Sequence, residues 1–229
     1  MLIKTEPYCQ YFCPKLSRFS GQLPDTKHAL LKPDGLLAYG GSLELHELLK
    51  NYRKGAFPWY TEGQPVIWWS PSKRLILRPQ NLRVNRTLRR KIKKNLYTIH
   101  KNKDFEQVIE KCANSNERKN NTWITKAVKQ AYLNLHNQGY AHSLECWSDG
   151  ELIGGLYGVS IGQIFFGESM FSLQNDASKL ALFALCRYEP YSNYHIIDCQ
   201  VESEHLKTLG AELIERSEFE RILKNYCEK

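Results

Sequence analysis

Residues 163–171 constrain the fold most, because they have the composition of a buried β-strand in the second half of the chain. The segment is QIFFGESMF, so one carboxylate, Glu168, stands among bulky apolar side chains. An ionised carboxylate buried without a partner is strongly destabilising. Glu168 is therefore expected to be paired, protonated or used in chemistry.

A second apolar strand, expected at residues 195–201, carries two more polar groups. Side chains alternate between the two faces of a strand, so Ile196, Asp198 and Gln200 share one face. Two such strands in one domain favour a functional site. The alternative interpretation is a buried hydrogen-bonded network that fixes strand register.

Composition excludes several classes of protein. The chain has 229 residues, 42% of them hydrophobic, which is enough for a full core and for two lobes. No apolar run reaches the roughly 18 residues of a membrane span, and residues 1–21 lack the apolar core of a signal peptide. We therefore expect a cytoplasmic protein that does not bind membranes.

The seven cysteines are an odd number, and several lie in apolar segments. This pattern fits reduced, buried thiols better than a disulfide framework. Cys9 and Cys13 come closest to a metal-binding pair, but no second pair at ligand spacing accompanies them. We predict no metal site and no cofactor.

Charge divides the chain into two opposite parts. Residues 1–139 hold 25 Lys and Arg against 10 Asp and Glu, a net charge of +15, whereas residues 140–229 hold 7 against 14, a net charge of −7. Between residues 73 and 103 there are twelve basic residues and no acid: Lys73, Arg74, Arg78, Arg83, Arg86, Arg89, Arg90, Lys91, Lys93, Lys94, Lys101 and Lys103. This density favours contact with a polyanion, most simply nucleic acid, over a merely solvated basic surface.

Caps and hydrophobic periods predict the elements. Helices are expected from Ser42 to Gly55, after Asp104, and from Thr122 to Gly139. An antiparallel meander is expected over residues 143–171, followed by alternating helices and strands, the last helix being opened by a capping box at Ser217.

This alternation predicts an α+β fold in which a mixed sheet carries packed helices, the general plan of GNAT acyltransferases. A smaller α/β N-terminal domain precedes it. We expect an N-terminal extension at residues 1–21, a basic N-terminal domain at 22–103 and a catalytic domain at 104–229. The glycine-rich turn that holds coenzyme A in GNAT enzymes is missing, so another acyl carrier is expected.

Aromatic residues offer surfaces for such a carrier. An acyl donor with a phosphate backbone would use the basic half, and its terminal adenosine would stack on flat rings. Trp59 and Trp123 are better placed for a ligand than Trp68 and Trp69, because they stand where a helix ends or begins. Plain core packing is the alternative for any one of these rings.

Ten collinear motifs between about residues 30 and 222 closely resemble those of bacterial leucyl/phenylalanyl-tRNA–protein transferases. They are PDGLLA with GG (33–41), YRKGAFPW (52–59), WWSP (68–71), TWI (122–124), AHS (141–143), GGLYGV (154–159), FGESMFS (166–172), ASK (177–179), DCQ (198–200) and LGA (209–211). Departures include Ser42 in place of the usual acid after Gly-Gly and a lengthened segment before Thr122.

The resemblance implies transfer of Leu or Phe, with Met as a minor donor, from aminoacyl-tRNA to the N-terminal Arg or Lys of a protein. This modification marks the protein for degradation by the N-degron route. The resemblance implies a GNAT-like C-terminal domain, and we expect a monomer. The rival interpretations are an arginyl-tRNA–protein transferase, a Fem-type aminoacyl transferase, and a non-catalytic RNA-binding protein.

The resemblance also implies residue roles. Trp59 and Trp123 would hold the terminal adenine, with Tyr52 nearby. The pocket for the Leu or Phe side chain would be lined by Leu156, Phe165, Met170 and Ile197. Glu168 and Gln200 would contact the aminoacyl end and the amine, with Asp198 orienting Gln200. The tRNA backbone would lie on Arg86, Arg89, Arg90, Lys91, Lys93 and Lys94.

Overall fold

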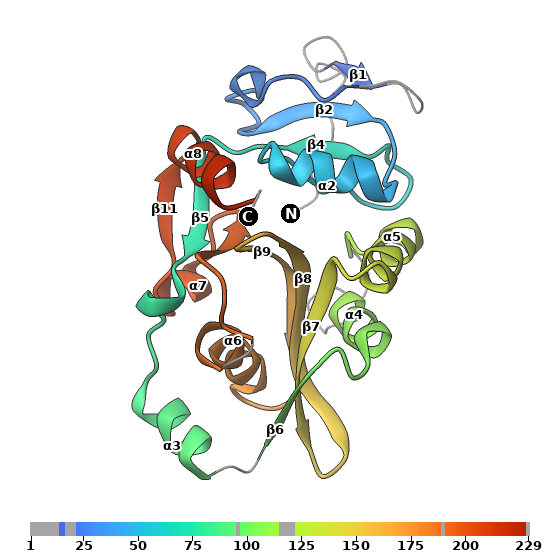
Figure 1. The fold of residues 1–229 in the computed structure, drawn as a ribbon. Coiled ribbons are helices and arrows are strands. Elements are labelled where there is room, and N and C mark those ends of the chain that lie inside the picture. Colours follow the sequence, from blue (N-terminus) through green and yellow to red (C-terminus); the bar gives the residue numbers. More distant parts are fainter. Residues whose placement is uncertain (1–13, 17–21, 95–96, 115–121, 189–190, 228–229) are drawn as a thin grey trace.

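A computed structural model describes residues 14–16, 22–94, 97–114, 122–188 and 191–227. Most of the expected extension at residues 1–21 lies outside the described residues. The chain forms two β-sheets with helices packed on them (Figure 1). The mixed arrangement of strands and helices that the sequence predicts is confirmed.

The smaller sheet is built from the N-terminal part of the chain. Its strand order is β1 (Lys15–Leu16), β2 (Leu36–Gly40), β4 (Ile67–Trp69) and β3 (Phe57–Pro58). Helix α2 (Leu45–Arg53) places its apolar residues at helical spacing, and Leu48 and Tyr52 are fully buried. A short 3-10 turn, η1 (Thr26–His28), precedes β2.

The larger sheet has seven strands in the order β11-β5-β10-β9-β8-β7-β6. The predicted meander is confirmed as β7 (Ala141–Ser148), β8 (Glu151–Ile161) and β9 (Ile164–Ser172). Strand β10 (Ile196–Gln200) pairs in parallel with β9 and antiparallel with β5 (Lys73–Leu77). The edges are β11 (Glu212–Glu215) and β6 (Thr98–Lys101).

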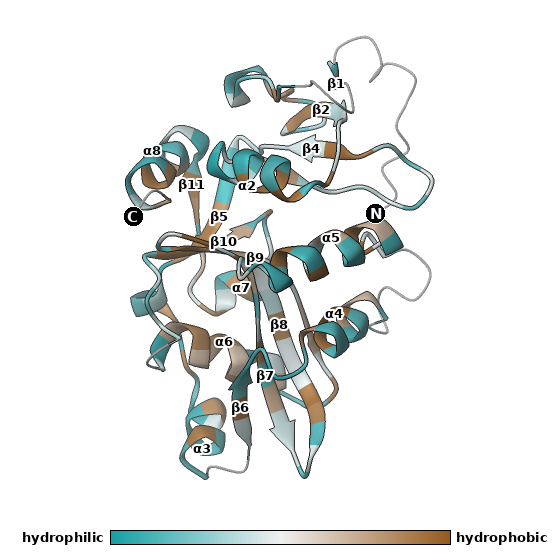
Figure 2. Ribbon diagram, turned by 45° about the vertical axis from the view of Figure 1, so that its right-hand side comes forward, coloured by the Kyte–Doolittle hydropathy of each residue, from teal (hydrophilic) through white to brown (hydrophobic). Residues whose placement is uncertain are grey.

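Helices cover both faces of the meander. Helix α6 (Ala177–Arg187) packs on β7 and β8 from one side, and α4 (Phe105–Ala113) and α5 (Lys126–Asn137) pack on the other (Figure 1). The remaining elements are η2 (Pro79–Asn81), α3 (Arg86–Lys94), α7 (Glu204–Thr208) and α8 (Arg216–Tyr226). Surface helices such as α5 and α8 carry both hydrophilic and hydrophobic residues, as a helix with one buried side requires (Figure 2).

Three helix starts differ from the prediction, although the cap at Asp104 is confirmed. Helix α2 begins at Leu45 with Glu44 as its N-cap, not at Ser42. Helix α5 begins at Lys126, because the Thr125 hydroxyl accepts the Val128 N–H at 3.2 Å. Helix α8 begins at Arg216 without a side-chain cap, so the expected capping box at Ser217 is wrong.

The range 22–103, expected as an N-terminal domain, contributes to both sheets. Strands β5 and β6 come from this range and pair within the seven-stranded sheet. The chain therefore passes from one sheet to the other between Trp69 and Lys73. Within the described ranges, no helix has the length and apolar character needed to cross a bilayer.

Candidate active site

A large cavity lies between the two sheets, bordered by β3, β4, β8, β9, β10 and α6, with a volume of about 1410 Å³. The sequence-predicted residues that line it are Trp59, Trp123, Leu156, Phe165, Glu168, Met170, Ile197 and Gln200. Tyr52 and Asp198 lie behind this surface, where both are fully buried. Residues that are far apart in the chain are thus brought to one site.

Glu168, on β9, accepts three hydrogen bonds from side chains. The hydroxyls of Tyr52 and Tyr132 donate to its two oxygens at 2.7 and 2.8 Å, and the amide of Gln200 donates to Oε1 at 2.9 Å. Burial raises the pKa of Glu168 to about 7, and the charge of Asp198 acts in the same direction. The three hydrogen bonds limit that rise, because they favour the charged form.

Two tyrosines surround the carboxylate, of which the sequence analysis identified one. Tyr52, expected near the adenine, is buried against Phe166 and contacts Glu168. Its hydroxyl lies 2.5 Å from that of Tyr132. Burial and the charge of Glu168 hold both tyrosine pKa values well above their usual range, so both hydroxyls stay protonated and can donate.

Asp198 is held by an arginine that the sequence analysis assigned elsewhere. Arg74 Nε and Nη2 donate to the two Asp198 oxygens at 2.8 and 2.7 Å, and Nη1 donates to the Gly55 carbonyl at 3.3 Å. The guanidinium also lies 4.6 Å from the ring centres of both Phe57 and Phe219. Arg74 is 1% exposed, so its expected contact with a polyanion is wrong.

The backbone explains how Asp198 and Gln200 acquire different partners although they were expected on one face. The pairing of β10 with β5 is irregular between these two residues, and Gln200 has a φ of 65°. Asp198 Oδ1 accepts the backbone N–H of Gln200 at 2.9 Å, which holds this left-handed conformation. In this conformation the Gln200 amide donates to Glu168, while Asp198 contacts Gln200 through the main chain.

The four apolar residues predicted to form a side-chain pocket are two cross-strand pairs. Leu156 on β8 lies opposite Met170 on β9, and Phe165 on β9 lies opposite Ile197 on β10. All four line the cavity. Gly158 makes room for this packing, since a Cβ there would lie 2.6 Å from the Phe165 ring.

The two tryptophans expected to bind an adenine both line the cavity. Trp59 is 37% exposed, and its carbonyl accepts the Trp69 indole N–H at 2.7 Å. Trp123 packs edge-on against Tyr132 at a ring-centre distance of 6.4 Å. Trp68 is buried and donates to the Gly40 carbonyl at 3.1 Å, which fits the structural role expected for it.

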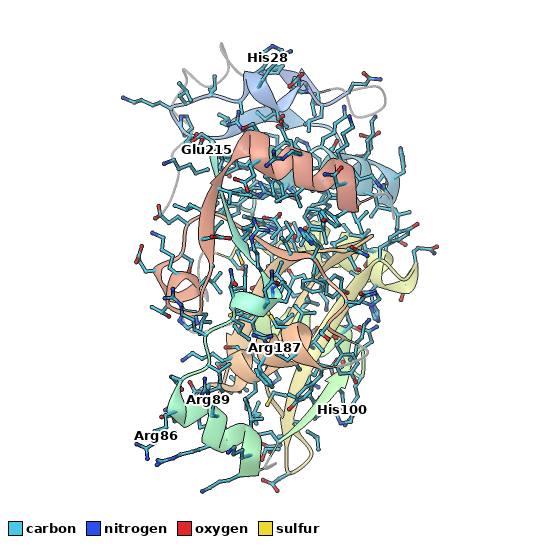
Figure 3. The ribbon with its side chains drawn as sticks, turned by 60° about the vertical axis from the view of Figure 1, so that its left-hand side comes forward. His28, Arg86, Arg89, His100, Arg187 and Glu215 are labelled. Carbon is cyan, nitrogen blue, oxygen red and sulfur yellow. The ribbon has the colours of Figure 1, made fainter. Side chains whose placement is uncertain are left out.

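The basic run divides into paired and exposed residues. Lys73 and Arg78 form ion pairs with acids of β11 and α8, and Lys91 contacts Asp176 at 3.0 Å. The basic run contains no acid of its own, and acids from the C-terminal half of the chain pair with these three cations instead. Five cations of α3 remain exposed: Arg86, Arg89, Arg90, Lys93 and Lys94. Figure 3 shows Arg86 extending away from the body of the molecule.

Sequence reasoning missed Arg74 and Tyr132 as members of the site. Arg74 directly precedes the apolar residues Leu75, Ile76 and Leu77, and a charge at the start of a buried strand signals a buried partner. Tyr132 lies on the buried face of α5 with Val128 and Leu135, and a buried tyrosine hydroxyl also requires a partner. Among the described residues, no group of three or more His, Cys, Asp or Glu side chains could hold a metal ion. Cys9 and Cys13 lie outside these residues.

Comparison with known proteins identifies the family. Residues 76–224 match the family described as leucyl/phenylalanyl-tRNA protein transferase, and residues 41–72 match the N-terminal domain of the same family. A leucyl/phenylalanyl-tRNA–protein transferase of Methylococcus capsulatus is 48% identical over 205 residues, covering 90% of this chain and 87% of the relative. A relative of the same name from Aromatoleum aromaticum is 49% identical and covers 89% of this chain and 86% of its own length. Another, from Pseudomonas fluorescens SBW25, is 44% identical and covers 93% of this chain and 95% of its own length. This chain belongs to the leucyl/phenylalanyl-tRNA–protein transferase family.

Proposed function

We propose that this chain transfers Leu or Phe, and more slowly Met, from aminoacyl-tRNA to the N-terminal Arg or Lys of proteins. Family membership establishes the reaction class, an aminoacyl-tRNA-dependent transfer to protein N-termini. The family role marks the product for degradation by the N-degron route. We further propose that the enzyme acts in the cytoplasm as a monomer.

One observation carries the proposal: Glu168 and Gln200 are in contact at the wall of a cavity that the apolar residues Leu156, Phe165, Met170 and Ile197 also line. An amine and an ester carbonyl could be held there side by side. The amine nitrogen forms a bond to the carbonyl carbon, and the bond from that carbon to the ribose oxygen breaks. The proton lost by the amine balances the proton gained by the ribose oxygen.

The pKa of Glu168 suits this proton transfer. At about 7 it lies close to neutrality, where a carboxyl group can both accept and return a proton. The attacking α-amine has an ordinary pKa of about 7.7–8.0, so part of it is already neutral near pH 7. Holding the two reactants in contact then supplies much of the acceleration.

Gln200 and Asp198 have supporting roles in this proposal. The Gln200 amide donates its N–H to Glu168, which leaves its oxygen to accept from the amine. An amide oxygen is too weak a base to remove the proton, so Gln200 aligns the amine. Asp198 is bound on both oxygens by Arg74, so it positions Gln200 and does not act as a base.

The apolar pairs favour the proposed amino acids. Leu156, Met170, Phe165 and Ile197 would surround an unbranched-at-Cβ or aromatic side chain and exclude a charged one. Discrimination in such a pocket is only about 1–3 kcal/mol per methylene. Transfer of Met at a reduced rate is therefore expected.

The remainder of the donor would lie on the aromatic and basic surfaces. We propose that Trp59 and Trp123 hold the terminal adenine and that α3 contacts the tRNA backbone through Arg86, Arg89, Arg90, Lys91, Lys93 and Lys94. The net negative charge of residues 140–229 would attract an acceptor that begins with Arg or Lys. The mixed pairing of β10 supports a GNAT-like plan for the larger sheet.

The decisive assay supplies separately labelled Leu-, Phe-, Met- and Arg-tRNA with a peptide that starts with Arg and a matched peptide that starts with Ala. Label is expected in the Arg-starting peptide from Leu- and Phe-tRNA, and less from Met-tRNA. Transfer from Arg-tRNA would indicate an arginyl transferase instead. Glu168→Gln should abolish most of the transfer while leaving tRNA affinity unchanged. A protein that binds tRNA but transfers none of these residues would refute the proposal.

A further inference from the structure

A second cavity, of about 560 Å³, lies between α3, β6 and the C-terminal half of α6. We call it the α3–α6 cavity. Its basic groups are Lys91, His100 and Arg187, and its rings include Tyr97, Phe183 and Tyr188. No carboxylate is found among the described residues that line it. A volume in this range is typical of sites for small organic ligands.

Helix α6 separates this cavity from the large one. Ser178, Leu182 and Leu185 of α6 line the large cavity, whereas Phe183 and Arg187 line the α3–α6 cavity. An α-helix with its side chains is about 10 Å across. One extended strand of nucleic acid could therefore contact both cavities.

Lys91 stands where the two cavities meet. It lines the α3–α6 cavity, and its ammonium group lies 3.0 Å from Asp176 Oδ2 and 2.5 Å from the Asn175 carbonyl. Asn175 and Asp176 line the large cavity. A chain that leaves the large cavity along this edge would meet Lys91 first and the exposed cations of α3 next.

Exposed aromatic rings mark the two cavities. Among the described residues, Trp59 and Tyr188 are the large aromatic side chains that are exposed, by 37% and 39%. Trp59 lines the large cavity and Tyr188 the α3–α6 cavity. Tyr188 packs edge-on against Phe183, with ring centres 5.4 Å apart, which fixes its orientation.

Arg187 is fixed beside this ring. Its Nη2 donates to the Gln80 carbonyl at 2.9 Å while the side chain stays exposed. Figure 3 shows Arg86 and Arg89 on α3, Arg187 at the end of α6 and His100 on β6 around one end of the molecule. The cations thus continue beyond the cavity, as an extended polyanion requires and a single small anion does not.

We propose that the α3–α6 cavity is a second nucleotide-binding site, which takes an unstacked nucleotide of the same tRNA whose 3′ end occupies the large cavity. Arg187 contacts its phosphate, and the Tyr188 ring stacks on its base. Proteins recognise unpaired RNA by this combination of aromatic stacking and cationic contact. The inference rests on the proposed function, because it assumes that tRNA is the donor.

The test measures the affinity of the full chain for uncharged tRNA, so that it does not depend on transfer. Loss of one base stack weakens binding by about 5- to 150-fold, which is the effect expected for Tyr188→Ala. Tyr188→Phe retains the ring and should bind within about twofold of the parent. Arg187→Ala should reduce the slope of log affinity against log salt by about one.

Arg221→Ala is the matched control, because Arg221 is an exposed arginine on α8, which Figure 1 shows far from α3. It should leave the tRNA affinity unchanged. Melting temperatures of the variants check that each folds. At saturating Leu-tRNA, Tyr188→Ala should keep the parental kcat and show its defect in KM for tRNA alone, with KM for the peptide unchanged.

Three outcomes would overturn the inference: parental tRNA affinity in both Tyr188→Ala and Arg187→Ala, an equal loss in Tyr188→Phe and Tyr188→Ala, or AMP alone competing at the affinity of tRNA. The last would indicate a site for a free nucleotide. Failure of the proposed function is distinguishable, since tRNA binding that depends on Tyr188 would then persist without any transfer to the peptide.

Discussion

Removal of the Tyr132 hydroxyl tests whether Glu168 is the titrating group of the reaction. The hydroxyl donates to Glu168 Oε2 at 2.8 Å and so stabilises the charged carboxylate. Tyr132→Phe leaves the ring in its buried place and removes that donor, together with the 2.5 Å contact to the Tyr52 hydroxyl. Because the charged form loses a hydrogen bond, the pKa of Glu168 must rise above its present value of about 7.

The size of the rise follows from the energy of the lost bond. A hydrogen bond to a charged group contributes about 1.5–3 kcal/mol, and one pKa unit corresponds to about 1.4 kcal/mol. The pKa of Glu168 should therefore reach about 8–9 in Tyr132→Phe. At pH 7 the ionised fraction would fall from about one half to about 1–10%, which predicts a rate about 5- to 50-fold lower if the carboxylate form is active.

The assay is the single-turnover rate of Phe transfer from preformed Phe-tRNA to an Arg-starting peptide, measured between pH 6 and 9. The ratio of the variant rate to the parental rate cancels the titration of the peptide amine. This ratio should be lowest near and below pH 7 and return towards one at pH 9. Tyr140→Phe is the control, because Tyr140 is a partly buried tyrosine outside the hydrogen-bond network of Glu168.

Two results would refute the reasoning. A ratio that stays constant across the pH range would show that the hydroxyl acts by packing or by direct contact with substrate. A Tyr132→Phe variant that is faster than the parent at pH 7 would show that the protonated carboxyl is the active form.

Three further predictions concern stability and donor binding. Arg74→Met should lower the free energy of unfolding in urea by about 3–5 kcal/mol, since it leaves Asp198 as a buried unpaired charge. Adding Asp198→Asn should restore part of the lost stability. An Arg74→Met variant as stable as the parent would contradict this prediction. Gly158→Ala should cost about 1–3 kcal/mol in the same measurement, because its Cβ would lie 2.2 Å from the Phe166 carbonyl oxygen. Trp59→Ala should weaken tRNA binding by about 5- to 150-fold, and it should also lower the melting temperature because the ring packs against Trp69. Parental affinity would exclude stacking on this ring.

Strand periodicity predicted that Asp198 and Gln200 share a face and marked Glu168 as the polar residue of a second apolar strand, whereas the family resemblance assigned the three to one site. Period-two alternation is a local property, and the apolar neighbours of each residue made a polar side chain conspicuous. In the structure the Gln200 amide donates to Glu168 at 2.9 Å. The separate partners of Asp198 were not predictable, because they depend on a strand irregularity at Gln200 that no local pattern indicates.

Partners from distant strands and helices were harder to predict. Arg74 looked like one more cation in a basic run, and only the pairing of β5 with β10 brings it to Asp198. Tyr52 and Tyr132 occupy helical positions typical of core residues, and the tertiary packing of α2 and α5 decides that their hydroxyls meet Glu168. Charge counting along the chain likewise missed that acids of the C-terminal half neutralise several cations.

The left-handed backbone at Gln200 complicates any alanine scan of this enzyme. Removing the amide group also removes the hydrogen bond to Glu168, which is one of the two contacts that hold residue 200 in its left-handed conformation. Residues other than Gly, Asn and Asp rarely adopt the φ of 65° found there. An alanine variant could therefore relax its main chain and displace the neighbouring strand end as well as lose the amide. Its defect would overstate the share of the amide in catalysis. Gln200→Asn, which tolerates the same φ and keeps an amide of shorter reach, separates these two contributions.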